Sequence, residues 1–252
     1  LVVSFSGGVD STFLLAAAQE AIGDQVTAVT AAGRSVPERE IEEAKEFCRE
    51  RGIRHIVFAF DELEVKGFAD NPPDRCYHCK TAILQKVREA AEQVDTVHIA
   101  EGSNMDDDGD YRPGKRAVKE ARVISPLREA GLTKAEIRRL SKEMGLETWD
   151  KPSFACLASR FAYEEPITAE KLRMVELAEE FLREHGFSQY RVRMHGSMAR
   201  VEVLPEDLER LLDPDLRKEF TTHMKELGFT YTALDLDGYR TGSMNAVLEE
   251  KA

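Results

Sequence analysis

The first stretch of the chain, residues 1–15, LVVSFSGGVDSTFLL, limits the possible folds more than any other. A short apolar run rich in β-branched residues stops at Ser6-Gly7-Gly8 and continues as an apolar, alanine-rich segment, which predicts a strand, a tight turn and a helix. Adjacent glycines permit a positive φ and a close approach of the backbone to a ligand. The first N–H groups of the helix face the turn, where the helix dipole favours an anion. The stretch therefore predicts a site for a phosphate chain.

The side chains around this turn suit the same ligand. Ser6, Ser11 and Thr12 would add hydroxyl donors, and Asp10 would orient a donor or hold Mg²⁺. An ordinary capped turn is the alternative, but Ser-Gly-Gly-Val-Asp-Ser is denser in small and polar residues than a cap requires. It is neither a Walker A loop nor the dinucleotide fingerprint. It resembles the PP-loop of the ATP pyrophosphatases, which implies cleavage of ATP between its α- and β-phosphates and adenylation of a substrate oxygen.

Strands and helices alternate after this turn. Expected strands cover residues 25–30, 53–60 and 96–100, and expected helices cover 37–51, 79–93 and 133–144. The alternation predicts a parallel sheet with helices on both faces, in which ligands lie at the carboxyl ends of the strands. The opening turn and a loop rich in Gly, Asp and Asn at 101–114 both follow strands. Both are therefore expected at that edge of the sheet.

The pattern changes beyond residue 148. We expect an α/β domain over residues 1–148, a linker carrying Cys156 over 149–166, and a smaller α+β domain over 167–252 that serves substrate binding and oligomerisation. The smaller domain is predicted to hold a charged helix at 168–185, a hairpin with strands at 190–194 and 200–204, helical segments at 205–227 and a last strand at 228–236.

The composition of the chain limits the partners and the cellular location that we expect for it. The net charge is −12, from 35 basic and 47 acidic residues, which disfavours an extended nucleic-acid surface because such a surface needs a basic face. No apolar run is long enough to cross a bilayer, so no membrane partner is expected. The four cysteines, at 48, 76, 79 and 156, are too few to staple 252 residues and fit a cytoplasmic location or a metal site. Cys48 adjoins Phe47 on an expected helix, which favours packing over chemistry.

A second polar cluster, EGSNMDDD, occupies residues 101–108 and is followed by YRPG. Its small residues would let an adenylate approach closely, and its carboxylates suit Mg²⁺. Alone it reads equally well as a solvated acidic loop, but paired with the opening turn it resembles the second nucleotide motif of the PP-loop superfamily. Asp10 and Ser11 are expected to act in catalysis, with Asp10 also holding Mg²⁺. The residues expected to bind ATP are Ser6, Gly7, Gly8, Val9, Asp10, Ser11, Thr30, Gly102, Ser103, Asn104, Asp107 and Arg112.

The remaining thiols point to further chemistry. Residues 75–80, RCYHCK, contain a Cys-x-x-Cys pair, which is typical of a redox pair, half a zinc site, part of an iron–sulfur site or two loop thiols. A closed zinc site is disfavoured because there is no second such pair and no well-spaced histidine pair. Cys156 lies near Lys151 and Arg160, and such cations lower the pKa of a thiol. The three thiols would hold three irons of a [4Fe–4S] cluster, or Cys156 is the chemical residue and the pair is accessory.

These stretches together resemble one family over nearly the whole chain, the LarE-type ATP-dependent sulfur transferases. The matching stretches are SFSGGVDST, RCYHCK, EGSNMDDDGDYRPG, KPSFACLASR, the hairpin at 191–202 and DGYRTGS. The resemblance implies an adenine nucleotide alpha hydrolase-like fold. It also implies an enzyme that adenylates a carboxylate of pyridinium-3,5-biscarboxylic acid mononucleotide, releases pyrophosphate and replaces AMP with sulfur. The product would serve biosynthesis of the nickel-pincer nucleotide cofactor of lactate racemase.

The family resemblance also implies two sources of sulfur. In one version a single cysteine, matching Cys156, gives up its own sulfur and becomes dehydroalanine; in the other, three cysteines and a [4Fe–4S] cluster deliver sulfide. The presence of Cys76 and Cys79 favours the cluster, with Cys76, Cys79 and Cys156 as its ligands. The residues expected to bind the substrate's phosphate and carboxylates are Arg191, Arg193, Arg200 and Arg240, which would otherwise be exposed arginines. Glu202 would hold a metal or orient one of them.

Three rival functions are compatible with the sequence. A tRNA thiolase of the same superfamily also combines an ATP loop with three cysteines, but the acidic balance opposes it. An ammonia-delivering ligase would need a glutaminase segment and would leave the cysteines unexplained. A non-catalytic adenine-nucleotide-binding protein is the third. We expect a cytoplasmic, homo-oligomeric transferase that uses ATP and Mg²⁺ on a small pyridinium mononucleotide, without nucleic acid.

Overall fold

The computed structural model describes all residues except 110–112, 154, 241–242 and 244–252, and the chain divides into two compact units. Unit 1 comprises Leu1–Phe68 and Asp74–Phe154, and unit 2 comprises Ala69–Pro73 and Ala155–Ala252. Residues 69–73 are thus grouped with unit 2, although the sequence predicts them in the first domain. The reason is local bonding: the Asn71 side chain donates to the Ala162 carbonyl at 2.6 Å, and the Ile167 N–H donates to the Ala69 carbonyl at 2.8 Å.

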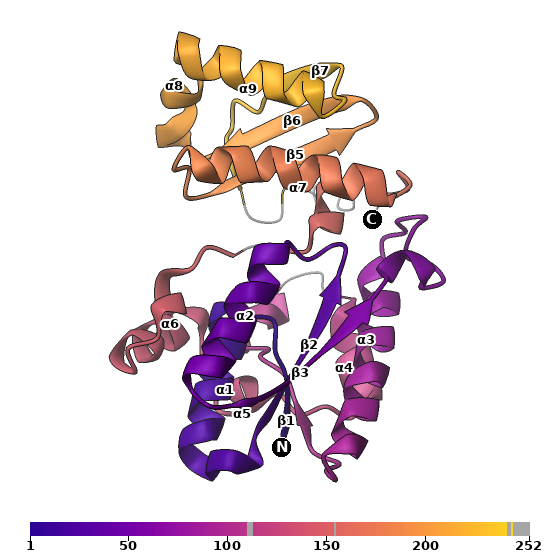
Figure 1. Cartoon of the computed structure of the whole chain (residues 1–252), viewed down its shortest axis with the longest axis vertical. Coiled ribbons are helices and arrows are strands. Elements are labelled where there is room, and N and C mark those ends of the chain that lie inside the picture. The colour runs from indigo at the N-terminus through magenta and orange to yellow at the C-terminus, as the bar shows by residue number, and fades with distance from the viewer. Residues whose placement is uncertain (110–112, 154, 241–242, 244–252) are drawn as a thin grey trace. The chain divides into compact units, whose positions relative to one another are not determined.

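Unit 1 is built on a parallel sheet of four strands in the order β3-β2-β1-β4 (Figure 1). The strands are β1 (Val2–Ser4), β2 (Thr27–Gly33), β3 (Arg54–Phe60) and β4 (Ile99–Ala100). Because β1 is paired on both edges and covered on both faces, Val2 and Val3 are fully buried. A strand buried on both faces is apolar without alternation, which is how this one appears in the sequence. The predicted parallel α/β sheet is confirmed.

Helices cover both faces of this sheet. The helices of unit 1 are α1 (Val9–Ile22), α2 (Glu38–Glu50), α3 (Arg75–Gln93), α4 (Gly114–Glu120), α5 (Pro126–Glu129) and α6 (Lys134–Glu143). One apolar core joins β1 to α1, α2, α5 and α6, and the other joins β1 and β2 to α3 and α4. Cys48 lies in the first core, where burial raises the pKa of its thiol to about 12. The prediction that Cys48 serves packing is confirmed.

Two helix starts bear on the site. α3 begins at Arg75, so the Cys-x-x-Cys pair lies in the first two turns of a helix that the sequence predicts only from residue 79. The helix starts directly after Asp74, once the proline pair at 72–73 has passed. The start of α6 is as predicted: the Thr133 hydroxyl accepts from the Glu136 N–H at 3.3 Å, and the Glu136 carboxylate accepts from the Thr133 N–H at 2.9 Å.

Unit 2 is a smaller α+β structure. Strands β5 (Tyr190–His195) and β6 (Met198–Val203) form an antiparallel hairpin, and β7 (Tyr231–Leu234) pairs with β6 in parallel. Its helices are α7 (Ala169–Glu184), α8 (Leu208–Leu211) and α9 (Pro214–Glu226). Short 3₁₀ turns in the two units cover Gly23–Gln25, Glu62–Glu64, Met105–Gly109, Glu147–Asp150, Leu157–Arg160 and Pro205–Asp207. Among the described residues, every helix is too short or too polar to span a membrane.

Candidate functional site

The turn between β1 and α1 is closed by its own side chains. Gly7 takes a positive φ of 71°, which glycine adopts without a steric penalty. The Ser11 hydroxyl donates to the Gly8 carbonyl at 3.2 Å and accepts from the Ser6 N–H at 3.3 Å. The Ser6 hydroxyl lies 3.0 Å from that of Ser11. This turn, residues 6–11, is called the PP-loop below; it leads directly into the first N–H groups of α1, which lack partners within the helix.

A cavity of about 210 Å³ lies over the PP-loop. It is lined by residues of the PP-loop, of the start of α3 and of the loop after β4, namely Ser4, Ser6, Gly8, Asp10, Ser11, Lys80, Glu101, Gly102, Ser103 and Asp107. The two polar loops thus meet at the carboxyl end of the sheet, where a parallel α/β sheet places its ligands. Hydroxyls and helix N–H groups beside one lysine suit a phosphate chain.

Gly102 lets the two loops approach each other. A Cβ atom at this position would lie 3.0 Å from the Ser11 nitrogen and 3.2 Å from the Asp10 carbonyl carbon. Both neighbours are backbone atoms of the first turn of α1, which cannot move aside as a side chain would. Only glycine therefore fits here without displacing the helix start that faces the cavity.

Asp10 is the centre of the polar contacts. Its carboxylate accepts from the Asn104 amide at 3.3 Å and from the Lys134 ammonium at 2.6 Å. The Asp107 carboxylate in turn accepts the Asn104 N–H at 3.0 Å. Mg²⁺ is usually held by one or two carboxylates together with substrate phosphates, so Asp10 and Asp107 fit this ion. Among the described residues, no three His, Cys, Asp or Glu side chains form an all-protein metal site.

Some of the predicted ATP-binding residues line the cavity, and others are buried in unit 1. Seven of the predicted residues line the cavity: Ser6, Gly8, Asp10, Ser11, Gly102, Ser103 and Asp107. Val9 buries its side chain in the core of unit 1, so only its backbone belongs to the PP-loop. Thr30 is also buried, and its hydroxyl donates to the Phe5 carbonyl at 2.8 Å, so it supports the end of β1 from behind the cavity. Arg112 lies outside the described residues.

Two lysines at this site were not predicted. Lys80 lines the cavity from the first turns of α3, and its position directly after the Cys-x-x-Cys pair was the available signal. Lys134 reaches Asp10 from the first residue of α6, and its backbone N–H donates to the Asp106 carboxylate at 2.8 Å. Its position just after the capping residue Thr133 is what aims the side chain at the PP-loop.

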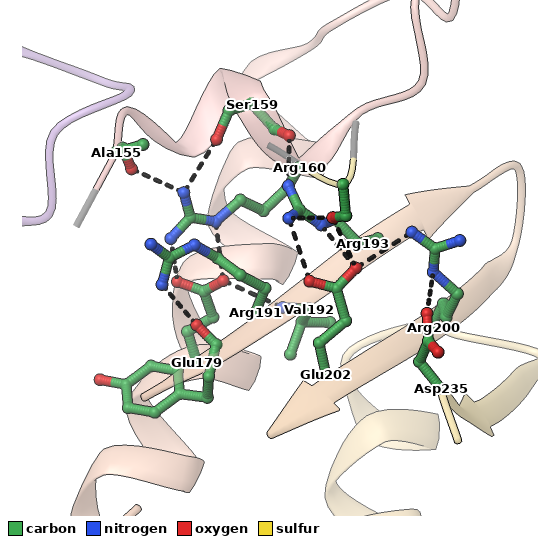
Figure 2. Close-up of polar contacts among 12 residues, drawn as sticks. Ala155, Ser159, Arg160, Glu179, Arg191, Val192, Arg193, Arg200, Glu202 and Asp235 are labelled. Carbon is green, nitrogen blue, oxygen red and sulfur yellow. Dashed lines mark hydrogen bonds and ion pairs between the residues drawn. The ribbon is translucent and has the colours of Figure 1, made fainter. Parts of the chain in front are cut away.

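A buried ion pair in unit 2 organises the turn that carries Cys156 (Figure 2). Arg160 binds both carboxylate oxygens of Glu179 on α7, each at 2.7 Å. The same guanidinium donates to the carbonyls of Ala155 at 2.6 Å and Cys156 at 3.3 Å. Burial opposes the charge of Glu179, but Arg160 outweighs it and the pKa of Glu179 is lowered. The backbone of Cys156 is therefore fixed to the core of unit 2, while its side chain is exposed.

The predicted substrate arginines do not share one environment. Arg193 and Arg200 face each other across the hairpin, and both bind Glu202, at 3.0 Å each (Figure 2). Like charges opposite each other in a sheet repel, and the fully buried Glu202 compensates them. These contacts fit the predicted role of Glu202 in orienting arginines, and its predicted role in holding a metal stays a prediction. Arg240 pairs with Asp237 at 2.9 Å and is exposed.

Arg191 is buried, and its surroundings disfavour its positive charge. It donates to the Tyr190 carbonyl at 2.6 Å and lies 5.0 Å from the centre of the Tyr239 ring. Burial, together with the positive charge of Arg160, lowers the pKa of Arg191 to about 10. An anionic group placed beside it would stabilise its charged form.

The thiols are distributed over both units. Cys76 is exposed and Cys79 half-buried, three residues apart in the first two turns of α3, so they share a helix face. Two thiols so spaced fit one edge of an iron–sulfur cluster. Cys156 precedes the 3₁₀ turn Leu157–Arg160 in unit 2. The four cysteines, all in the described part of the chain, are not in disulfides.

The parallel sheet, the PP-loop and the polar loop that meets it define unit 1 as a PP-loop domain. The family model of queuosine biosynthesis protein QueC matches residues 1–70. The chain is 35% identical over 249 residues to pyridinium-3,5-bisthiocarboxylic acid mononucleotide synthase of Lactiplantibacillus plantarum, covering 98% of this chain and 90% of that protein. The chain therefore belongs to the LarE-type family of sulfur-transferring PP-loop enzymes, and the resemblance seen in the sequence is confirmed.

Two further relatives mark the range of this superfamily. The chain is 38% identical over 247 residues to an uncharacterized protein of Synechocystis, with 98% of this chain and 92% of that protein covered. It is 29% identical over 189 residues to tRNA-specific 2-thiouridylase MnmA of Rickettsia felis, with 60% and 52% covered. The match to the tRNA enzyme is thus partial, whereas those to the other two relatives span nearly the whole chain.

Proposed function

We propose that this protein adenylates a carboxylate of pyridinium-3,5-biscarboxylic acid mononucleotide with ATP and replaces the AMP with sulfur. The thiocarboxylate product would serve biosynthesis of the nickel-pincer nucleotide cofactor of lactate racemase. The observation that carries this proposal is the 35% identity, over 98% of the chain, to a synthase of pyridinium-3,5-bisthiocarboxylic acid mononucleotide. A cytoplasmic location and homo-oligomerisation stay predictions from the sequence.

The PP-loop cavity supports the activation step. A carboxylate oxygen attacks the α-phosphorus of ATP, the bond from that phosphorus to the bridging oxygen breaks, and pyrophosphate leaves with the electron pair. The N–H groups at the start of α1, the Ser6 and Ser11 hydroxyls and Lys80 would stabilise charge on the phosphates. Asp10 and Asp107 would hold Mg²⁺, which neutralises phosphate charge when bound. Lys134 would then exchange its contact with Asp10 for one with a phosphate oxygen.

Unit 2 supports acceptor binding and the sulfur step. The mononucleotide carries a phosphate and carboxylates, and an anion would stabilise the charged form of the buried Arg191. Arg193, Arg200 and Arg240 would complete this set, with Glu202 orienting the first two. A sulfur nucleophile attacks the acyl carbon, the bond to the AMP oxygen breaks, and AMP leaves.

Two sources of sulfur remain in the proposal. Cys76, Cys79 and Cys156 would hold three irons of a [4Fe–4S] cluster, which would supply sulfide bound at the fourth iron as the nucleophile. Alternatively the Cys156 thiolate forms a thioester; removal of its α-proton then breaks the Cβ–S bond, releasing the thiocarboxylate and leaving dehydroalanine. The exposed side chain of Cys156 is compatible with either source.

Anaerobic turnover tests this proposal. Purified protein is analysed for iron and then incubated with Mg²⁺, ATP and the pyridinium dicarboxylate mononucleotide, and pyrophosphate, product mass and protein mass are measured. We expect acceptor-dependent pyrophosphate and a product in which sulfur replaces oxygen. An unchanged protein mass with iron bound would support the cluster, and loss of one sulfur and two hydrogens from Cys156 without iron would support the sacrificial route. Absence of pyrophosphate, or thiolation of tRNA instead, would contradict the proposal.

A further inference from the structure

Lys151 lies where the chain leaves unit 1 for the segment that carries Cys156. Its ammonium contacts three acceptors: the Gly7 carbonyl at 3.2 Å and the carboxylates of Glu40 and Glu43 at 2.6 Å each. An ammonium has three N–H donors, so these contacts use all of them. The side chain is only 14% exposed. The contact between Lys151 and Glu40 is buried and therefore screened less by water and salt than an exposed surface pair.

The main chain around Lys151 is anchored as well. The Arg138 guanidinium, on α6, donates to the Trp149 carbonyl at 2.7 Å and to the Lys151 carbonyl at 2.9 Å. The Lys142 ammonium lies 4.3 Å from the centre of the Trp149 ring. Residues 149–151 are thus held to unit 1, and only residues 152–155 separate them from Cys156. On the other side, Arg160 holds the Ala155 and Cys156 carbonyls to unit 2.

The contact with Gly7 bears on phosphate binding through peptide geometry. In a planar trans peptide the C=O of one residue and the N–H of the next point in opposite directions. By holding the Gly7 carbonyl on the α2 side, Lys151 directs the Gly8 N–H away from α2, and Gly8 lines the phosphate cavity. Gly7 has φ 71° and no side chain to resist a flip of this peptide, which would turn a carbonyl oxygen toward the phosphates. The flip would break the hydrogen bond from Lys151 to the Gly7 carbonyl, so this contact opposes it.

We propose that Lys151 is a positioning residue that couples nucleotide binding at the PP-loop to the conformation of the Cys156 segment. Phosphates bound at the Gly8 N–H would stabilise the observed orientation of the Gly7–Gly8 peptide. In that orientation the Gly7 carbonyl accepts from Lys151, so the phosphates would also stabilise this contact and the anchoring of residues 149–151. By reciprocity, loosening that anchor weakens nucleotide binding. The coupling rests on the proposed use of ATP but not on the identity of the acceptor.

The test follows Cys156 in the intact chain without any acceptor. Alkylation of Cys156 by iodoacetamide is timed by peptide mass spectrometry, with and without Mg²⁺ and α,β-methylene-ATP, and binding of this analogue is measured by calorimetry. In the wild type we expect the analogue to change the alkylation rate about fivefold or more. In Lys151→Met this change should fall to near one and the analogue should bind about tenfold more weakly, whereas Lys151→Arg should keep most of both.

The matched control is Lys45→Met, which removes a lysine of α2 that pairs with Glu42 but does not contact the PP-loop. The second variant, Glu40→Gln with Lys151→Met, avoids a buried unpaired carboxylate and keeps the test usable if the single variant does not fold. A wild-type nucleotide effect on Cys156 in Lys151→Met or in the double variant, or no effect in the wild type, would overturn the coupling. Failure of pyrophosphate release alone would overturn the proposed reaction instead, because alkylation and analogue binding need no acceptor.

Discussion

At the scale of single residues, the site depends on how closely backbone can approach backbone. Gly102 brings the loop after β4 against the first turn of α1, and Gly7 supplies the positive φ that turns the chain into the helix. The side chains that line the cavity are small hydroxyls and carboxylates with one lysine. Phosphate recognition here therefore rests on the absence of side-chain bulk as much as on charge.

Gly102→Ala should weaken nucleotide binding directly, because it displaces the start of α1 at the cavity. The new methyl group would lie 3.0 Å from the Ser11 nitrogen, so the helix start has to shift. Overpacking of this kind costs about 1–3 kcal/mol. We expect the affinity for ATP to fall about tenfold, measured by calorimetry. Gly114→Ala is the control, because its nearest neighbours would be 3.8 Å away; an equal loss of affinity there would contradict the explanation.

His55 should make stability depend on pH. Burial and then the charge of Lys45 lower the pKa of His55 to about 4 from its usual 6.5. Because Thr30 donates its hydrogen to Phe5, the His55 Nε2 must donate to Thr30, which is possible for the neutral ring. The unfolded state then binds the proton more tightly, so this contribution is complete above about pH 6.5 and is lost as the pH falls toward 4.

Urea unfolding at pH 5 and pH 7.5 measures this effect. The difference in unfolding free energy between the two pH values should be smaller in His55→Gln than in the wild type. His98→Gln, at an exposed histidine, should leave the difference unchanged. If His55→Gln retains the full pH dependence, other groups are responsible for it.

At the scale of elements, helix starts carry the functional groups. α1 presents its N–H groups to the cavity, α3 carries both cysteines of the pair and Lys80 in its first turns, and α6 begins with Lys134 against Asp10. A helix start has fixed directions for backbone and side chains, so it can aim a group that a loop would leave mobile. The cap of each helix is therefore part of the site.

Thr133→Ala should affect both stability and nucleotide binding. It removes the capping box of α6, at a cost of about 1 kcal/mol, and loosens the residue that aims Lys134 at Asp10. We expect a lower unfolding midpoint and a higher KM for ATP. Thr168→Ala removes a similar cap from α7 in unit 2 and should lower stability without changing KM. A matching rise in KM for both variants would show that the effect is only one of stability.

The elements also show what sequence could and could not predict. The PP-loop and the α6 cap were predictable, because glycine, hydroxyl and carboxylate positions act within a few residues. Contact between Glu202 and an arginine was one of two predictions for that residue, but which arginine it binds was not predictable, since Glu202 lies opposite Arg191 in the register and pairs diagonally with Arg193. Thr30 is expected to bind ATP, and its hydroxyl also contacts Phe5 and His55, which the sequence could not predict because these contacts form only when three strands are paired. Contacts between residues far apart in the sequence were therefore the least predictable part of the site.

At the scale of the whole molecule, the two units contain different groups through which each can be followed. The only tryptophan, Trp149, belongs to unit 1, as does the nucleotide cavity. Unit 2 contains two buried charge pairs, Arg160 with Glu179 and Arg193 with Glu202. Perturbations can therefore be directed at one unit and followed there.

Glu179→Gln should destabilise unit 2 selectively. Removing one partner of a buried pair leaves the other charge uncompensated, at a cost of about 3–5 kcal/mol. We expect the far-ultraviolet circular dichroism transition to move to lower temperature while Trp149 fluorescence keeps its midpoint and its response to Mg²⁺ and ATP. Glu180→Gln, which breaks a more exposed pair with Arg183 on the same helix, should cost less than about 1 kcal/mol. Coincident shifts of both probes would show that the units unfold together.

The short segment Ala69–Pro73 makes the chain visit unit 2 twice, once early and once from Ala155 onward. Unit 2 is therefore formed from two separate stretches of the chain. A single cut between residues 152 and 155 would leave residues 69–73 still hydrogen-bonded to Ala162 and Ile167. A continuous stretch that covers unit 1 also contains residues 69–73 of unit 2, and a stretch that starts at Ala155 lacks them. A chimaera that exchanges everything after the Cys156 turn would therefore have to supply a new acceptor for the Asn71 side chain.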